Sequence, residues 1–491
     1  MSGIAGIIGK TGKIGRKEIN KLLDKISHRG ENRELLDLTE GIAGINTNYD
    51  YQAKANGRTI LLDGRIYNLD ELLQKYSIEV KRQGLSDIEK ISLLIQEKGA
   101  DIFKDLKGSF AMAVSDSEGN TYLARDMLGR KPLYYSKENG SLLFASEVKS
   151  MIELTNDIIE FPPGSYMENL SKPNIIKIVD TDNYSIIRDE DLGTLEERLS
   201  IHLLNSMDAR ISNKNLDLGV WLSGGLDSSV VAALLKEFSQ DIYTYSVGYE
   251  GSPDMIAAKK VAEHLGTDHT EYELDVDELF ENIPKTIYHL ESFDAPLVRS
   301  TLGNMIVSRI SASSDMVFSG EGGDELFAGY NYFLDLDSSN VIQEELVNAI
   351  NALHNTALQR VDRTANAYSV NVKLPLLDEN LLNYVLRIPP RDKVRKDKNT
   401  GKYILRKIAA RYLPDDIAWR DKDKFWEGAG IENTLEMKID SIVSDREFSE
   451  RTSQEGTVLR NKEELYYHKV FREHFADVDV NNFLSFTQDF N

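Results

Sequence analysis

Short apolar runs separated by turn-forming residues fill roughly the first 180 residues of the chain. Runs such as GIAGIIG, RTILLDGRIYN and GSFAMAVSD alternate with DSEGN and KENG, which are typical of hairpin turns. Only two segments, Lys17–Ser27 and Ser86–Gln96, have the spacing of apolar positions expected of amphipathic helices. The pattern therefore predicts an N-terminal domain dominated by antiparallel sheet.

A polar, acidic stretch at Val179–Leu199 ends this pattern, and an amphipathic helix is expected after Asp191. We place a domain boundary here, with one domain over residues 1–185 and a second over residues 191–491. Beyond it, apolar strands alternate with helices in the segments LDLGVWLS, DSSVVAALLKEF, DIYTYSVGY, PDMIAAKKVAEHLG and DMVFSGEGGDE. Such alternation predicts an α/β domain with a parallel sheet covered on both faces. The last ~120 residues are expected to be largely helical.

The length, charge and cysteine content of the chain exclude several classes of function. The 491 residues exceed the size of one growing core and fit two or three domains. A formal charge of −22 opposes binding to nucleic acid or to an anionic membrane, although small anions can bind locally. No apolar run reaches 18 residues and the N-terminus lacks the pattern of a signal peptide, so we expect a cytoplasmic protein. Because the chain has no cysteine, it has no disulfide and no thiol nucleophile.

The strongest chemical signal is SGGLDSS at Ser223–Ser229, between an apolar strand and a helix. Its glycines allow backbone N–H groups to face a ligand, and the helix N-terminus adds partial positive charge, which together suit a phosphate or pyrophosphate. Asp227 within such a loop implies a bridging Mg²⁺. Taken alone, the stretch also fits an ordinary Gly-Gly loop, but ligands collect where strands of such sheets end.

A second candidate, SGEGGDE at Ser319–Glu325, also follows a predicted strand. It offers Glu321 and Asp324 as a general base and a second Mg²⁺ ligand, the alternative being a solvated acidic turn. The stretch WRDKDKF adds Lys422 and Lys424, which could stabilise charge on a phosphate or form a surface charge run.

Together with YSVGYEGSPD, HLGTDH and LPLLD, these motifs resemble those of the glutamine-dependent asparagine synthetases, in the family's order. The resemblance implies an ATP-pyrophosphatase (PP-loop) fold for the second domain, with ATP and Mg²⁺ required. It also implies the following roles for individual residues: pyrophosphate binding by Ser223, Gly224, Gly225, Asp227 and Ser228; Mg²⁺ binding by Asp227 and Asp324; a nucleoside pocket of Leu222, Val247, Ser319 and Gly320; a base at Glu321; and stabilisation of the adenylation transition state by Lys422.

The implied reaction joins aspartate and ammonia. The aspartate β-carboxylate attacks the α-phosphate of ATP to give β-aspartyl-AMP and pyrophosphate, and ammonia then displaces AMP to give asparagine. Adenylation is needed because a carboxylate oxygen is a poor leaving group at neutral pH. Arg299, in FDAPLVRST, suits the substrate α-carboxylate.

The N-terminal domain resembles the family's class II glutaminase, an N-terminal-nucleophile fold, through GIAGI, HRGEN, DGRIYN, SDIE and ASEVKS. Gly64 and Asp87 match the family, but the family's nucleophilic Cys is Ser2 here. Its oxyanion-binding Asn is Asp63, and the Glu that meets the substrate ammonium is Arg65. The Arg that grips the glutamine carboxylate is missing from GIAGINTN at Gly41–Asn48.

These four changes all act against glutamine, so we expect a glutaminase site that has lost its activity. An engineered Cys→Ser change would account for Ser2 alone, which favours natural loss. Members of the family are often dimers, and this chain could form a homodimer in the same way.

Two other functions stay open. A relative of the β-lactam synthetase or lasso-peptide cyclase type would adenylate another carboxylate and use an amine other than ammonia. It is favoured by Asn371, Val372 and Lys373, which stand where the family has Glu-x-Arg, and disfavoured by the retained Glu321. A non-catalytic nucleotide-binding module would require a broken phosphate loop, whereas SGGLDSS is intact.

Overall fold

The computed structural model describes residues 1–9, 15–49, 52–80, 82–138, 140–169, 171–176, 184–211, 215–421, 431–451 and 458–487. The chain divides into two compact units. Unit 1 comprises Met1–Val179 and Asp477–Leu484, and unit 2 comprises Asp180–Ala476 and Ser485–Asn491. The hydrophobic pattern does not show that a C-terminal segment returns to unit 1.

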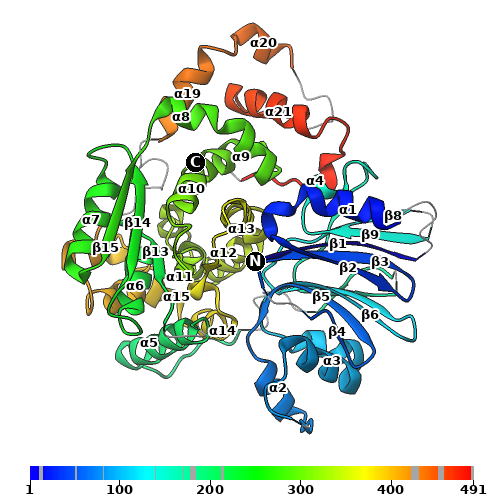
Figure 1. Ribbon diagram of the computed structural model, residues 1–491. Helices are drawn as coiled ribbons and strands as arrows, with labels where there is room; N and C mark the ends of the chain where they lie inside the picture. Colours follow the sequence, from blue (N-terminus) through cyan, green and yellow to red (C-terminus); the bar gives the residue numbers. More distant parts are fainter. Residues whose placement is uncertain are drawn as a thin grey trace. The chain divides into compact units, whose positions relative to one another are not determined.

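Two six-stranded sheets build unit 1, and each strand pair is antiparallel, which confirms the expected fold class (Figure 1). The first sheet has the order β10 (Ile159–Glu160), β8 (Tyr134–Glu138), β9 (Ser141–Ala145), β1 (Ser2–Gly9), β3 (Gly41–Thr47) and β2 (Asn32–Leu38). The second has the order β12 (Asn174–Ile175), β11 (Ser165–Glu168), β7 (Thr121–Arg125), β6 (Gly108–Asp116), β5 (Arg58–Ile66) and β4 (Lys54–Ala55).

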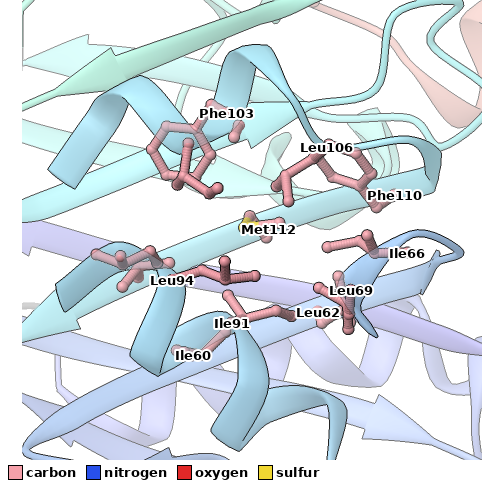
Figure 2. Packing of buried hydrophobic residues seen from close by; sticks show 14 of the residues in the cluster. Ile60, Leu62, Ile66, Leu69, Ile91, Leu94, Phe103, Leu106, Phe110 and Met112 are labelled. Atoms are coloured by element: carbon pink, nitrogen blue, oxygen red, sulfur yellow. The ribbon is translucent and has the colours of Figure 1, made fainter. Parts of the chain in front are cut away.

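Helices cover the outer faces of the two sheets in unit 1. The predicted helices are present as α1 (Arg16–Lys25) on the first sheet and α3 (Asp87–Lys98) on the second, and the short α2 (Leu69–Lys75) and α4 (Val148–Met151) were not predicted. Figure 2 shows the core beneath α3, where Ile60 and Leu62 of β5 meet Ile91 and Leu94. Because side chains alternate along a strand, Leu61 packs between the sheets instead. Asp63 shares the face of Leu61.

Unit 2 is built on a five-stranded parallel sheet, as the sequence predicts. Its strand order is β15 (Asp268–Glu273), β14 (Tyr243–Gly248), β13 (Leu218–Trp221), β16 (Met316–Phe318) and β17 (Val372–Lys373). Helices α6 (Leu226–Leu235) and α7 (Pro253–Leu265) pack together against this sheet, and α10 (Ala295–Ile310) contacts β14 (Figure 1). The helix expected after Asp191 is α5 (Leu192–Asp208), and the Asp191 side chain caps it by accepting a hydrogen bond from Thr194 N.

The rest of unit 2 is largely helical. Its remaining helices are α8 (Val276–Glu281), α9 (Ile283–Leu290), α11 (Gly323–Phe327), α12 (Ser339–Asn351), α13 (Ala357–Ala367), α14 (Glu379–Val385), α15 (Pro390–Lys393), α16 (Tyr403–Ala409), α17 (Asp415–Ala418), α19 (Ile431–Asp440), α20 (Asp445–Ser449) and α21 (Lys462–His474). In the described part of the chain, we find no helix with the length and apolar character needed to cross a membrane.

Candidate active site

The predicted phosphate loop connects β13 to the N-terminus of α6. Gly224 has a φ of 74°, a left-handed conformation that favours glycine. A Cβ at this position would lie 2.5 Å from Asp254 O and 2.6 Å from Ala258 N, so the backbone of α7 leaves no room for a side chain. The turn that directs the loop around the helix N-terminus therefore requires glycine.

Serine hydroxyls hold the loop in shape. Ser223 N donates to Ser228 Oγ at 3.2 Å, and the two serine hydroxyls lie 3.1 Å apart. Gly225 N also donates to Ser223 Oγ, at 3.3 Å. The polar groups of the loop thus form one connected network at the positive end of α6, an arrangement suited to phosphate oxygens.

The second predicted motif packs directly against the first, because β13 and β16 are neighbouring strands. A Cβ on Gly320 would lie 2.6 Å from Ser228 N, and one on Gly323 would lie 2.3 Å from Asp227 Cγ. The glycines of SGEGGDE are therefore what allow the two loops to touch. Asp227 and Asp324, predicted from separate motifs, meet in one cluster of charged groups.

Lys402 lies between these two carboxylates, a contact that sequence reasoning missed. Its Nζ is 2.7 Å from Asp324 Oδ1 and also contacts Asp227 Oδ2. Burial alone would lower the pKa of Lys402, but the charges of Asp227 and Asp324 outweigh it and raise this pKa above its ordinary value. The two carboxylates thus converge on a position that accepts a cation.

This donor set fits Mg²⁺, which takes carboxylate oxygens together with phosphate oxygens and water. Across the described ranges, no group of three or more histidine or acidic side chains is arranged to hold a metal ion. The protein would therefore supply Asp227 and Asp324, and the phosphate chain of a nucleotide would supply further ligands.

Glu321 lies in the same loop and is held by an arginine from α13. Arg360 Nη2 is 2.6 Å from Glu321 Oε1. Glu325, on α11, is buried, and burial followed by the charge of Asp324 raises the pKa of Glu325. The Tyr330 hydroxyl donates to Glu325 Oε1 at 2.5 Å. The SGEGGDE motif thus contains one arginine-paired carboxylate and one whose ionisation is disfavoured.

The other predicted residues are placed as follows. Leu222 and Val247 are buried at the carboxyl ends of β13 and β14, and Ser319 follows β16. Arg299, on α10, lies 3.2 Å from Glu463 Oε2 of α21, so its role toward a substrate carboxylate stays a prediction. Lys422 lies outside the described residues.

Arg420, two residues before Lys422, is a second residue that sequence reasoning missed. Its Nη1 donates to Gly224 O at 3.1 Å and its Nη2 contacts Asp254 Oδ1 at 2.8 Å. Both contacts tie the start of the WRDKDKF stretch to the phosphate loop. The sequence carries a weak signal for this contact, since Arg420 belongs to the WRDKDKF motif, in which the lysines are the predicted functional residues.

The predicted glutaminase site in unit 1 is built around Ser2 at the start of β1. Ser2 Oγ donates to Asp63 Oδ1 at 3.1 Å and accepts a hydrogen bond from Gly64 N at 3.3 Å. Arg29, which is fully buried, places Nη2 3.0 Å from Asp63 Oδ2 and Nη1 2.7 Å from Glu147 Oε1. The hydroxyl thus belongs to a buried ionic network that uses the Gly64 N–H.

Two further cations belong to the region around Asp63, Arg65 on the same strand and Lys131. Arg65 follows Asp63 by two residues on β5 and is exposed. In the described part of the chain, no hydrogen bond or ion pair engages its guanidinium. Lys131 Nζ lies 3.8 Å from Asp63 Oδ1, and Thr47 is the β3 residue paired with Ser2. Asp87 is the first residue of α3.

Comparison with known proteins gives one consistent result. A family model described as asparagine synthase matches residues 199–342 and 335–484, and one described as glutamine amidotransferase domain matches residues 1–174. Asparagine synthetase B [glutamine-hydrolyzing] of Escherichia coli K12 is 34% identical over 90% of this chain and 83% of its own length. A probable asparagine synthetase [glutamine-hydrolyzing] of Dictyostelium discoideum is 31% identical over 96% of this chain and 93% of its own.

Among solved structures, the Bacillus subtilis glutamine phosphoribosylpyrophosphate amidotransferase complexed with ADP and GMP is 16% identical and covers 55% of this chain and 65% of that chain. Its TM-score is 0.30.

Proposed function

The chain belongs to the asparagine synthase family, and we propose that it is an AMP-forming ligase that makes asparagine from aspartate, ATP and free ammonia. The observation that carries this proposal is the contact between SGGLDSS and SGEGGDE, which brings Asp227 and Asp324 onto one cation position beside a phosphate loop.

In the first step, an oxygen of the aspartate β-carboxylate attacks the α-phosphorus of ATP, and the bond to the pyrophosphate oxygen breaks. The network of Ser223, Gly225 and Ser228 would bind the departing pyrophosphate. Asp227 and Asp324 would hold Mg²⁺, which when bound neutralises phosphate charge. Leu222, Val247, Ser319 and Gly320 would line the nucleoside pocket, and Lys422 would stabilise the adenylation transition state.

In the second step, ammonia attacks the carbonyl carbon of β-aspartyl-AMP and the bond to AMP breaks. The nitrogen becomes strongly acidic once it has bonded to carbon, so even a weakly basic carboxylate can accept its proton. We assign this role to Glu321, which Arg360 holds in place at 2.6 Å. Arg299 is the candidate for binding the substrate α-carboxylate.

We further propose that glutamine no longer supplies the ammonia. Asp63 would repel a developing oxyanion, and the loss of one oxyanion-hole donor costs about 2.7–4 kcal/mol. The Gly64 N–H already donates to Ser2 Oγ, and Arg65 would repel the ammonium group of glutamine. Three of the four changes are independent of Ser2, which supports natural loss over an engineered substitution.

The proposal is tested by pyrophosphate release from ATP and Mg²⁺ with different acceptors. We expect release that depends on aspartate and ammonium together and yields AMP and asparagine in equal amounts. If no pyrophosphate were released with aspartate and ammonium but another carboxylate were turned over, the β-lactam synthetase or lasso-cyclase type would be favoured instead. The difference between Asn371–Lys373 and the family's Glu-x-Arg points to that type.

A further inference from the structure

Lys402 lies between the two predicted metal ligands and therefore affects how Mg²⁺ binds. We propose that Lys402 is an internal counter-ion that fills the divalent-cation position when no nucleotide is bound, so that Mg²⁺ binds only together with the nucleotide. This inference rests on the proposed function, because it assumes that Asp227 and Asp324 are the metal ligands. It concerns the order in which ligands bind.

The fold is built to hold this lysine in place. Lys402 precedes α16 with a φ of 54°, a left-handed conformation that is uncommon for residues other than glycine. A Cβ on Gly329 would lie 2.0 Å from Lys402 Cε and 2.0 Å from Asp324 Oδ1, so the glycine makes room for the ion pair. Lys402 is only 4% exposed, so its ammonium is largely shielded from bulk water.

The charges of Lys402, Asp227 and Asp324 explain why Mg²⁺ is expected to bind only together with the nucleotide. Two partly buried carboxylates and one buried ammonium leave a net charge of −1, which is too little to attract a divalent cation strongly. Mg²⁺ added to that cluster would lie beside the Lys402 ammonium and be repelled by it. A nucleotide brings several negative charges of its own. Its phosphates can pair with the displaced ammonium while Mg²⁺ takes over the carboxylates.

Mn²⁺, which replaces Mg²⁺ in oxygen-ligand sites, provides a direct readout because electron paramagnetic resonance measures the free ion without any turnover. For the unmodified protein, we expect no specific Mn²⁺ binding without nucleotide and one bound Mn²⁺ with α,β-methylene-ATP. Asp324→Asn gives the background from the acidic surface. Lys402→Met should bind Mn²⁺ without nucleotide at least ten-fold more tightly than the unmodified protein.

The matched control is Lys407→Met, which alters a more exposed lysine on α16, the helix that Lys402 precedes, and should leave Mn²⁺ binding unchanged. The gain in Lys402→Met should disappear in the double variant with Asp324→Asn. Equal, Asp324-dependent Mn²⁺ binding by the unmodified protein with and without nucleotide would overturn the proposal, even if no Lys402 variant folds. The proposal would also be overturned if Lys402→Met, shown by circular dichroism to be folded, bound Mn²⁺ without nucleotide no more tightly than the unmodified protein.

Failure of the proposed function has a different signature. A protein that binds Mn²⁺ neither alone nor with the nucleotide analogue would contradict ATP use, whereas the response of Lys402→Met without nucleotide still decides whether the lysine occupies the cation position.

Discussion

Gly323→Ala should reduce aspartate-dependent pyrophosphate release about 100-fold or more while leaving the fold of unit 2 intact. The added Cβ would lie 2.3 Å from Asp227 Cγ and 2.4 Å from Asp227 Oδ1. The aspartate would have to rotate away from Lys402 and from the cation position, and misplacing a reacting group by about 1 Å costs on the order of 100-fold in rate. Stability should change little, because Gly323 opens α11 without a left-handed φ and alanine favours helix.

Pyrophosphate release and thermal unfolding of the same preparation separate these two effects. Gly193→Ala is the matched control, because this glycine lies at the exposed start of α5, where a Cβ meets only the Asp191 side chain, at 3.2 Å. It should keep full activity. A Gly323→Ala variant with normal turnover would show that the geometry of Asp227 does not matter for the reaction.

Arg29→Met should destabilise unit 1 by about 3–5 kcal/mol, the usual cost of removing one partner from a buried ion pair. Arg29 is fully buried and serves two buried carboxylates, Asp63 and Glu147. Without it, Asp63 keeps hydrogen bonds from the Ser2 and Ser146 hydroxyls and a longer contact to the Lys131 ammonium, at 3.8 Å. For a unit of this size, the melting temperature should fall by about 10 °C.

Calorimetry measures the shift, and hydrogen exchange of peptides from β1 and β3 assigns it to unit 1. Arg33→Met is the control, since its ion pair with Asp24 is exposed and should contribute no more than about 1 kcal/mol. If both variants melted at the same temperature, the buried ionic network around Ser2 would not stabilise unit 1.

The hydrophobic pattern predicted the strands and helices that carry the motifs. SGGLDSS was expected between a strand and a helix and lies between β13 and α6, and the acidic loop was expected after a strand and follows β16. Parallel order in the sheet then brings the two loops together, because the carboxyl ends of neighbouring parallel strands share one edge. The family resemblance implied that Asp227 and Asp324 bind Mg²⁺, whereas the neighbouring positions of β13 and β16 are seen only in the structure.

Partners supplied by distant segments could not be predicted in this way. Lys402 follows Asp227 by 175 residues, and no periodicity marks a lysine that reaches its partners through a left-handed backbone conformation. The same holds for Arg360, which pairs with Glu321 from another helix, and for Arg29, which reaches Asp63 across the two sheets of unit 1. Ion pairs between residues so far apart in the sequence depend on tertiary packing alone.

The central claim is that asparagine is made with ammonia and not with the amide of glutamine. It is tested most directly by ¹⁵N magnetic resonance of the asparagine formed from aspartate and ATP, with either ¹⁵N-ammonium or amide-¹⁵N-glutamine as the nitrogen source. We predict labelled asparagine from ammonium and none from glutamine. Labelled asparagine from glutamine at a comparable rate would contradict the lost glutaminase, and no asparagine from either source would contradict the proposed synthetase.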